Sequence, residues 1–206
     1  MSTVTEDNIK LLLGELATDS PNIFRIRSLC KENPGLVEAT GSRNHIWSLL
    51  LLGCIALKEN ETFLPSEIEC AEQHVLENDV KRTRSEIPDF RSPEYRKSLT
   101  EILQLFCVVH DIQYKQGMNE LVAPFLYLHS PPKGNALPFT LYEAFLFRYL
   151  ERYFCLDDSS FLFKAFRLFH ILLLYHDPQL ALHLDEHGSV AYAVKIIYLF
   201  PHFFFF

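Results

Sequence analysis

The chain has 206 residues, a length typical of one domain, and 49% of them are hydrophobic against 22% charged. This composition is globular and excludes a disordered or collagen-like chain. Because 26 Asp and Glu outnumber 19 Lys and Arg, the net charge of -7 argues against a protein that binds nucleic acid through its overall field.

Cysteine usage and the N-terminus indicate where the protein resides. The five cysteines are an odd number and contain no C-x-x-C pair, which favours a reducing compartment. The first residues have neither the basic start nor the apolar core of a signal peptide, and no apolar run reaches the length of a bilayer span. We therefore expect a cytoplasmic protein without a transmembrane segment.

Apolar residues recur at helical spacing from the start of the chain. The first such stripe lies within residues 9–16. Ser20 followed by Pro21 predicts an N-cap and the first position of a second helix. The nearly all-apolar segment 43–56 predicts a buried helix.

Capping patterns and prolines mark further helices. Ser66 with Glu69 has the spacing of a capping box. Ser92 followed by Pro93 predicts the start of a helix with a long apolar stripe. Pro124 is expected to kink or break the helix that follows.

The last third of the chain continues the helical pattern. Thr140 with Glu143 predicts the start of a helix, and the segment 160–175 predicts another. Asp177 and the proline after it predict a short helix that ends at Gly188.

Strands with period-two alternation are missing from the pattern, so the sequence predicts an all-α fold without a sheet. We expect a single domain of about eight to ten short helices. Polar, proline-containing joints near residues 58–65, 83–93 and 130–139 predict loops within this domain.

A basic window lies in the middle of the acidic chain. Residues 81–97 hold six cations against three acidic residues. One interpretation is an ordinary solvated loop and helix start, and the other is a positive rim that faces a phosphate-bearing partner. The cations are Lys81, Arg82, Arg84, Arg91, Arg96 and Lys97.

Two polar segments stand out beside this window. Asp79 and Arg82 are three residues apart at a predicted helix end, so they lie on one side of the helix, where a local ion pair is the simplest interpretation. Gln116 and Gly117 precede a predicted apolar helix. Glycine permits close approach of another backbone, and glutamine can both donate to and accept from a water molecule.

Three segments are specific in their residues and their order: residues 43–53 read RNHIWSLLLLG, residues 76–83 read LENDVKRT, and residues 114–119 read YKQGMN. In this order they resemble the motifs of the TBC-domain family of Rab GTPase-activating proteins. The first is similar to the family's Arg-x-x-Val-Trp followed by Leu-Leu-Gly, and the second to Ile-x-x-Asp-x-x-Arg-Thr with Leu76 in place of isoleucine. Residues 114–119, YKQGMN, match Tyr-x-Gln-Gly-Met-Asn at every named position, and a weaker echo follows at residues 177–184.

The resemblance implies roles for individual residues. It implies that Arg82 is an arginine finger and Gln116 a glutamine finger, and that Arg43 and Trp47 belong to a framework motif in which Trp47 is a core anchor. The residues implied to support the two fingers are Asp79, Thr83, Tyr114, Gly117 and Asn119.

The same resemblance implies the function. We expect a protein that is not itself an enzyme but accelerates GTP hydrolysis by a Rab-type small GTPase in the GTP-bound state, by inserting both fingers into its active site. Such a protein regulates membrane trafficking from the cytoplasm, with peripheral attachment to endomembranes as an open alternative. It has no cofactor or metal of its own, because the GTPase carries GTP and Mg, and it binds no nucleic acid.

The resemblance also implies a division of the chain. Residues 1–36 are expected to form an N-terminal helical extension and residues 37–206 the TBC domain. Family members continue through further helices beyond the segment at 177–184, whereas this chain ends in a phenylalanine-rich tail, Phe203 to Phe206. We therefore expect the C-terminal part of the domain to be incomplete.

Other interpretations remain open. The chain could be a non-catalytic GTPase-binding or scaffold module, inactive because of its short C-terminus. His183 to His187 satisfies the zinc-peptidase pattern H-x-x-E-H, but no Asp, Glu or Cys follows to complete the ligands. The acidic pair Asp157 and Asp158 is explained more simply by a helix N-terminus than by a cation site.

Overall fold

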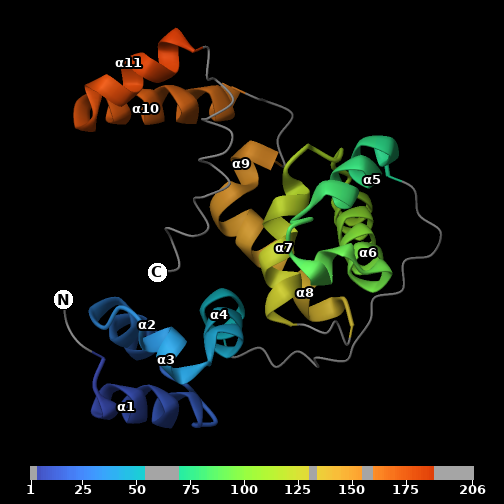
Figure 1. The fold of residues 1–206 in the computed structure, drawn as a ribbon. Helices are drawn as coiled ribbons and strands as arrows, with labels where there is room; N and C mark the ends of the chain where they lie inside the picture. The colour runs from blue at the N-terminus through green and yellow to red at the C-terminus, as the bar shows by residue number, and fades with distance from the viewer. Residues whose placement is uncertain (1–3, 54–69, 130–133, 155–159, 188–206) are drawn as a thin grey trace. The chain divides into compact units, whose positions relative to one another are not determined.

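The computed structural model describes residues 4–53, 70–129, 134–154 and 160–187 (Figure 1). Within these ranges all regular structure is helical, which confirms the predicted all-α fold. The chain divides into two compact units, one made mainly of residues 1–145 and the other of residues 146–205. The predicted capping box at Ser66, the acidic pair at Asp157, Gly188 and the C-terminal phenylalanines lie outside the described residues.

The first unit begins with four helices that share an apolar cluster. They are α1 (Glu6–Leu16), α2 (Ile23–Glu32), α3 (Leu36–Thr40) and α4 (Arg43–Leu52). The predicted boundary at residue 36 falls inside this cluster, and the assignment of residues 1–36 as an extension stays a prediction. The buried members of the cluster are Leu12, Leu16, Ile26, Leu36, Ile46 and Leu49.

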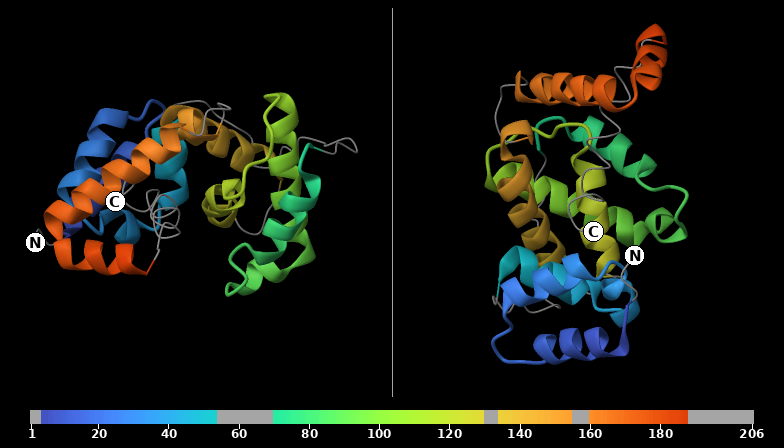
Figure 2. Two further views of the ribbon diagram at one scale, coloured as in Figure 1. Left: turned by 90° about the horizontal axis from the view of Figure 1, so that it is seen from above. Right: turned by 90° about the vertical axis from the view of Figure 1, so that its left-hand side faces the viewer.

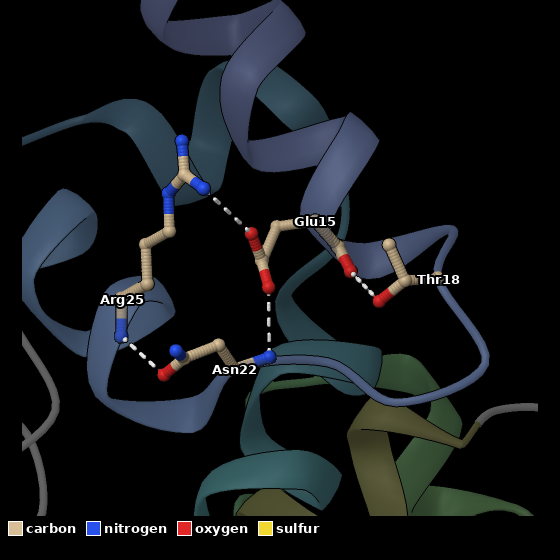
Figure 3. A network of polar contacts seen from close by, with 4 residues as sticks. All are labelled: Glu15, Thr18, Asn22 and Arg25. Carbon is tan, nitrogen blue, oxygen red and sulfur yellow. Dashed lines mark hydrogen bonds and ion pairs between the residues drawn. The ribbon is translucent and has the colours of Figure 1, made fainter.

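The start of α2 differs from the prediction (Figure 3). Asn22, not Ser20, caps the helix, because its side-chain oxygen accepts from the backbone N–H of Arg25 at 3.1 Å. Glu15 of α1 holds this turn through its carboxylate, which accepts from the Asn22 N–H at 2.8 Å and lies 3.5 Å from the Arg25 guanidinium. The N-cap of α2 is thus Asn22, and the predicted cap Ser20 lies two residues before it.

The second part of this unit is built around a long central helix. Helix α6 (Pro93–Val109) packs against α5 (Gln73–Arg82), α7 (Met118–Leu128) and α8 (Ala136–Phe145), and α5 also contacts α7 (Figures 1 and 2). Ser92 caps α6 as predicted, because its hydroxyl accepts from the Tyr95 N–H at 3.2 Å. The central buried side chains are Leu99, Ile102, Leu103, Phe106, Met118, Val122, Phe125, Leu126 and Tyr142.

Two predictions in this group are corrected: Pro124 does not break its helix, and Thr140 does not begin one. Helix α7 continues through Pro124, whose neighbours Ala123 and Phe125 are buried, so tertiary packing offsets the missing N–H. Helix α8 begins at Ala136, and Thr140 therefore lies inside it with its hydroxyl bonded to the Ala136 carbonyl at 2.9 Å. Residues 136–139 of the expected loop at 130–139 therefore belong to α8.

Helix α4 ends earlier than the predicted residue 56. Gly53, with φ of 71°, follows Leu52 and takes the chain out of helical conformation. The Trp47 side chain on α4 is buried, and its ring meets the ring of Phe125 on α7 edge-on with centroids 5.8 Å apart. The prediction that Trp47 lies in the core is confirmed, and the contact couples α4 to the helix that follows the Gln116 segment.

The second unit contains η2 (Leu146–Leu150), α9 (Glu151–Phe154), α10 (Ser160–His176) and α11 (Pro178–Glu186). Helices α10 and α11 pack against each other around Ala181, which is fully buried (Figure 1). Asp177 caps α11 as predicted, accepting from the Leu180 N–H at 3.0 Å. In the described residues no helix combines the length and the apolar character that a bilayer span requires.

Removing the Trp47 side chain should destabilise the protein because the Phe125 ring and its neighbours would then face a cavity. We expect Trp47→Ala to lower the free energy of unfolding by about 3–5 kcal/mol, measured by urea unfolding followed with circular dichroism. The control is Phe24→Ala, because Phe24 is 82% exposed. Equal losses in the two variants would contradict the role of Trp47 in the core.

Candidate functional site

The end of α5 places Arg82 on the surface. Thr83 follows the last helical residue with a non-helical ψ of 118°, and its backbone N–H and its hydroxyl both donate to the Asp79 carbonyl, at 2.9 and 2.8 Å. Thr83 is 1% exposed and Asp79 is 7% exposed, whereas Arg82 between them is exposed. A cation in the last helical turn is also favoured by the helix dipole. The buried neighbours thus fix the backbone from which the Arg82 side chain projects.

The carboxylate of Asp79 is held by the second segment. The Tyr114 hydroxyl donates to Asp79 Oδ2 at 2.9 Å, and it also lies 3.1 Å from Asn119 Oδ1. Tyr114 is 4% exposed. The hydroxyl has one proton, and the charged carboxylate is the stronger acceptor. This contact joins residues 35 positions apart in the sequence.

A tight turn presents Gln116. The Met118 N–H donates to the Lys115 carbonyl at 3.1 Å, and Gly117 takes φ of 103° at the start of α7, a conformation that requires glycine. The Gly117 N–H donates to Asn119 Oδ1 at 3.1 Å, and this buried hydrogen bond stabilises the turn. Gln116 at its tip is exposed.

Asn119 closes the network. Its Nδ2 donates to the Thr83 hydroxyl at 2.9 Å, while its oxygen accepts from the Gly117 N–H. Each polar group of Thr83 and Asn119 in this chain of contacts therefore has a partner, as a buried polar cluster requires. The structure thus brings together all five residues implied to support the fingers: Asp79, Thr83, Tyr114, Gly117 and Asn119.

The basic window is only partly a free rim. Lys81 and Arg82 are exposed at the end of α5. Arg84 instead pairs with Glu120 of α7, with Nε and Oε2 2.7 Å apart, and Arg91 donates from Nε to the Ser85 carbonyl at 2.6 Å. The contact of Glu120 with Arg84 could not be predicted from the sequence, because no local spacing signal connects two residues 36 positions apart.

Other candidate groups have contacts of their own. Arg43 pairs with Glu38 of α3. In the second unit His183 lies on α11 and His187 directly follows this helix, and Nδ1 of His187 donates to the His183 carbonyl at 2.7 Å. Within the described ranges no three His, Cys, Asp or Glu side chains gather as metal ligands.

The two buried thiols near α5 and α6 offer no nucleophile. Burial raises the pKa of the Cys107 thiol to about 12, and the neighbouring Cys70 acts in the same direction. Burial also raises the pKa of Cys70. Both thiols are therefore neutral at physiological pH.

The arrangement of these motifs agrees with a comparison against known families. The model of the Rab-GTPase-TBC domain matches residues 40–203. The chain belongs to the TBC-domain family of Rab GTPase-activating proteins. The match includes both segments of the buried network.

Curated TBC proteins are similar over part of their length. The TBC domain-containing protein kinase-like protein of Gallus gallus is 30% identical over 172 residues, covering 79% of this chain and 18% of the relative. The protein of the same name from Homo sapiens is 32% identical over 133 residues, which covers 63% of this chain and 15% of the relative. The chain thus spans less than a fifth of the length of these relatives.

A solved structure supports the fold. The crystal structure of the Ypt/Rab-GAP domain of Gyp1p superposes with a TM-score of 0.59, covering 88% of this chain and 69% of the other. Identity is 19%, so this likeness shows the TBC fold alone.

The Tyr114 hydroxyl should be important for stability. In Tyr114→Phe the buried Asp79 carboxylate loses its donor, and we expect the free energy of unfolding to fall by about 1–3 kcal/mol in urea titrations. The matched control is Tyr127→Phe on α7, where the side chain is 48% exposed. If both variants unfold at the same urea concentration as the wild type, the network does not stabilise the site.

Proposed function

We propose that the chain activates GTP hydrolysis by a Rab-type small GTPase in its GTP-bound state, with Arg82 and Gln116 acting in trans. The observation that carries the proposal is the buried Asp79–Tyr114–Asn119–Thr83 network. It fastens the Arg82 segment to the Gln116 segment and leaves both named side chains on the surface.

Arg82 suits the electrostatic part of the reaction. Negative charge spreads over the oxygens of the transferring phosphoryl group, and a guanidinium stabilises it with a planar fork of donors that remains charged at every physiological pH. Arg82 stands on a rigid helix end, so little ordering is needed when it enters the partner's active site. The protonated side chain acts by position and charge, and transfers no proton.

Gln116 suits the nucleophilic part. In-line attack needs a water molecule oriented toward the phosphorus, and a carboxamide can accept a hydrogen bond from that water while it donates to a phosphate oxygen. Under this proposal the partner carries GTP and Mg, and this chain contributes no cofactor. The setting is membrane trafficking, in the cytoplasm or on an endomembrane surface.

Substitution of either finger should abolish stimulation without unfolding the chain. We expect Arg82→Ala, Arg82→Lys and Gln116→Ala each to reduce stimulated hydrolysis by roughly 10³-fold, the scale of arginine fingers in general. The measurement is single-turnover hydrolysis across a panel of GTP-loaded Rab proteins. The circular dichroism spectra of the variants should stay unchanged, because both side chains are exposed.

The matched controls are Arg25→Ala and Gln179→Ala, exposed residues of the same types that lie outside both segments of the buried network. They should retain the wild-type rate. Full activity of Arg82→Ala on a responding Rab would refute the proposal. Tight binding of a Rab without any stimulation by the wild-type chain would instead support the alternative of a non-catalytic GTPase-binding or scaffold module.

A further inference from the structure

A second contact lies directly beside the buried network. Thr83 and Arg84 follow Arg82, and Asn119 and Glu120 follow the Gln116 turn. Asn119 Nδ2 donates to the Thr83 hydroxyl at 2.9 Å, and Arg84 Nε lies 2.7 Å from Glu120 Oε2. Two consecutive residues of one segment therefore contact two consecutive residues of the other. The first contact is neutral and buried, and the second is charged and lies closer to solvent.

The geometry of the charged contact is fixed on both sides. Arg84 has φ of 44°, a conformation that residues with a Cβ rarely adopt, so its direction is set by the turn after α5. The Ile87 N–H donates to the Arg84 carbonyl at 2.8 Å and holds that turn. Glu120 lies in the first turn of α7, where a carboxylate is favoured by the helix dipole.

Partial burial makes this pair stronger than an ordinary surface pair. The exposed fractions of the two side chains are 32% for Arg84 and 28% for Glu120. A short, charge-assisted hydrogen bond in a half-buried position is screened less than an exposed ion pair. By contrast, Lys97 and Glu101 on α6 lie 3.8 Å apart, with Lys97 77% exposed.

We propose that the Arg84–Glu120 ion pair is a positioning device that fixes the distance between the Arg82 and Gln116 segments. This inference rests on the proposed function of the same site. The Arg84 guanidinium pairs with Glu120 and does not contact the GTPase. Loss of the pair should loosen the turn after Arg82 and misplace the arginine in the transition state, while the surface that first meets the GTPase is unchanged.

A positioning role and a direct contact with the GTPase differ in their effects on kcat and KM. A misplaced catalytic group stabilises the transition state less and lowers kcat, whereas loss of a direct contact weakens association and raises KM. We expect Arg84→Gln and Glu120→Gln each to lower kcat by roughly ten- to a hundredfold, a range typical of misplaced catalytic groups, with KM nearly constant. The Arg84→Gln/Glu120→Gln double variant should be no slower than the slower single variant, because both changes remove the same contact.

The same cycle at a second ion pair is the control. Arg25 and Glu15, which join α2 to α1, also form an Arg–Glu pair, at 3.5 Å (Figure 3). Arg25→Gln, Glu15→Gln and the double variant should keep the wild-type kcat. Arg84→Lys, which retains the charge, should recover most of the activity lost in Arg84→Gln. Should a glutamine variant fail to fold, Glu120→Asp shortens the same side chain and should lower kcat in the same way.

The outcomes separate this inference from the proposed function when Arg82→Ala is assayed in the same series. If Arg82→Ala is inactive while both single glutamine variants keep the wild-type kcat, the positioning role is wrong and the proposed function stands. If Arg84→Gln raises KM alone and Glu120→Gln has no effect, Arg84 contacts the GTPase directly and the inference is overturned. A fully active Arg82→Ala would overturn both.

Discussion

A buried carboxylate that must keep its hydrogen-bond donor is the constraint on which this site depends. Asp79 lies on α5, and its donor, the Tyr114 hydroxyl, comes from the segment before α7. Burial of an ionised group without a partner costs several kcal/mol, so the two segments are held together as a condition of folding. This contact therefore also brings together the segments that contain Arg82 and Gln116.

In this network the residues that fix the backbone are buried, and the side chains beside them are exposed. Thr83 and Asn119 are buried and bonded to each other, whereas Arg82 and Gln116 beside them are exposed. Backbone geometry is thus set by the buried residues, whereas the Arg82 and Gln116 side chains are exposed. Gly117 completes this division, because its positive φ reverses the chain between the exposed tip and the buried start of α7. The proposed action in another protein's active centre needs exposed side chains on a backbone of fixed geometry.

The sequence predicts local structure better than long-range contacts. The caps at Ser92 and Asp177 could be predicted because each satisfies N–H groups within its own helix start. The break expected at Pro124 and the helix start expected at Thr140 are not found, because packing around α7 and α8 overrides local preference. The roles of Asp79 and Tyr114 came from the family resemblance, since spacing does not show that residues 35 positions apart will meet. The Arg84–Glu120 pair could not be predicted from the sequence, because neither local spacing nor a family motif indicated that the two residues meet.

The central claim is that Arg82 and Gln116 reach one phosphoryl group together. Its most direct test is a crystal structure of the chain bound to a responding Rab loaded with GDP and aluminium fluoride, which mimics the transferring phosphoryl group. The account predicts the Arg82 guanidinium within hydrogen-bond distance of the fluoride ligands and the Gln116 carboxamide within hydrogen-bond distance of the attacking water. A complex in which either side chain lies away from the nucleotide would contradict it.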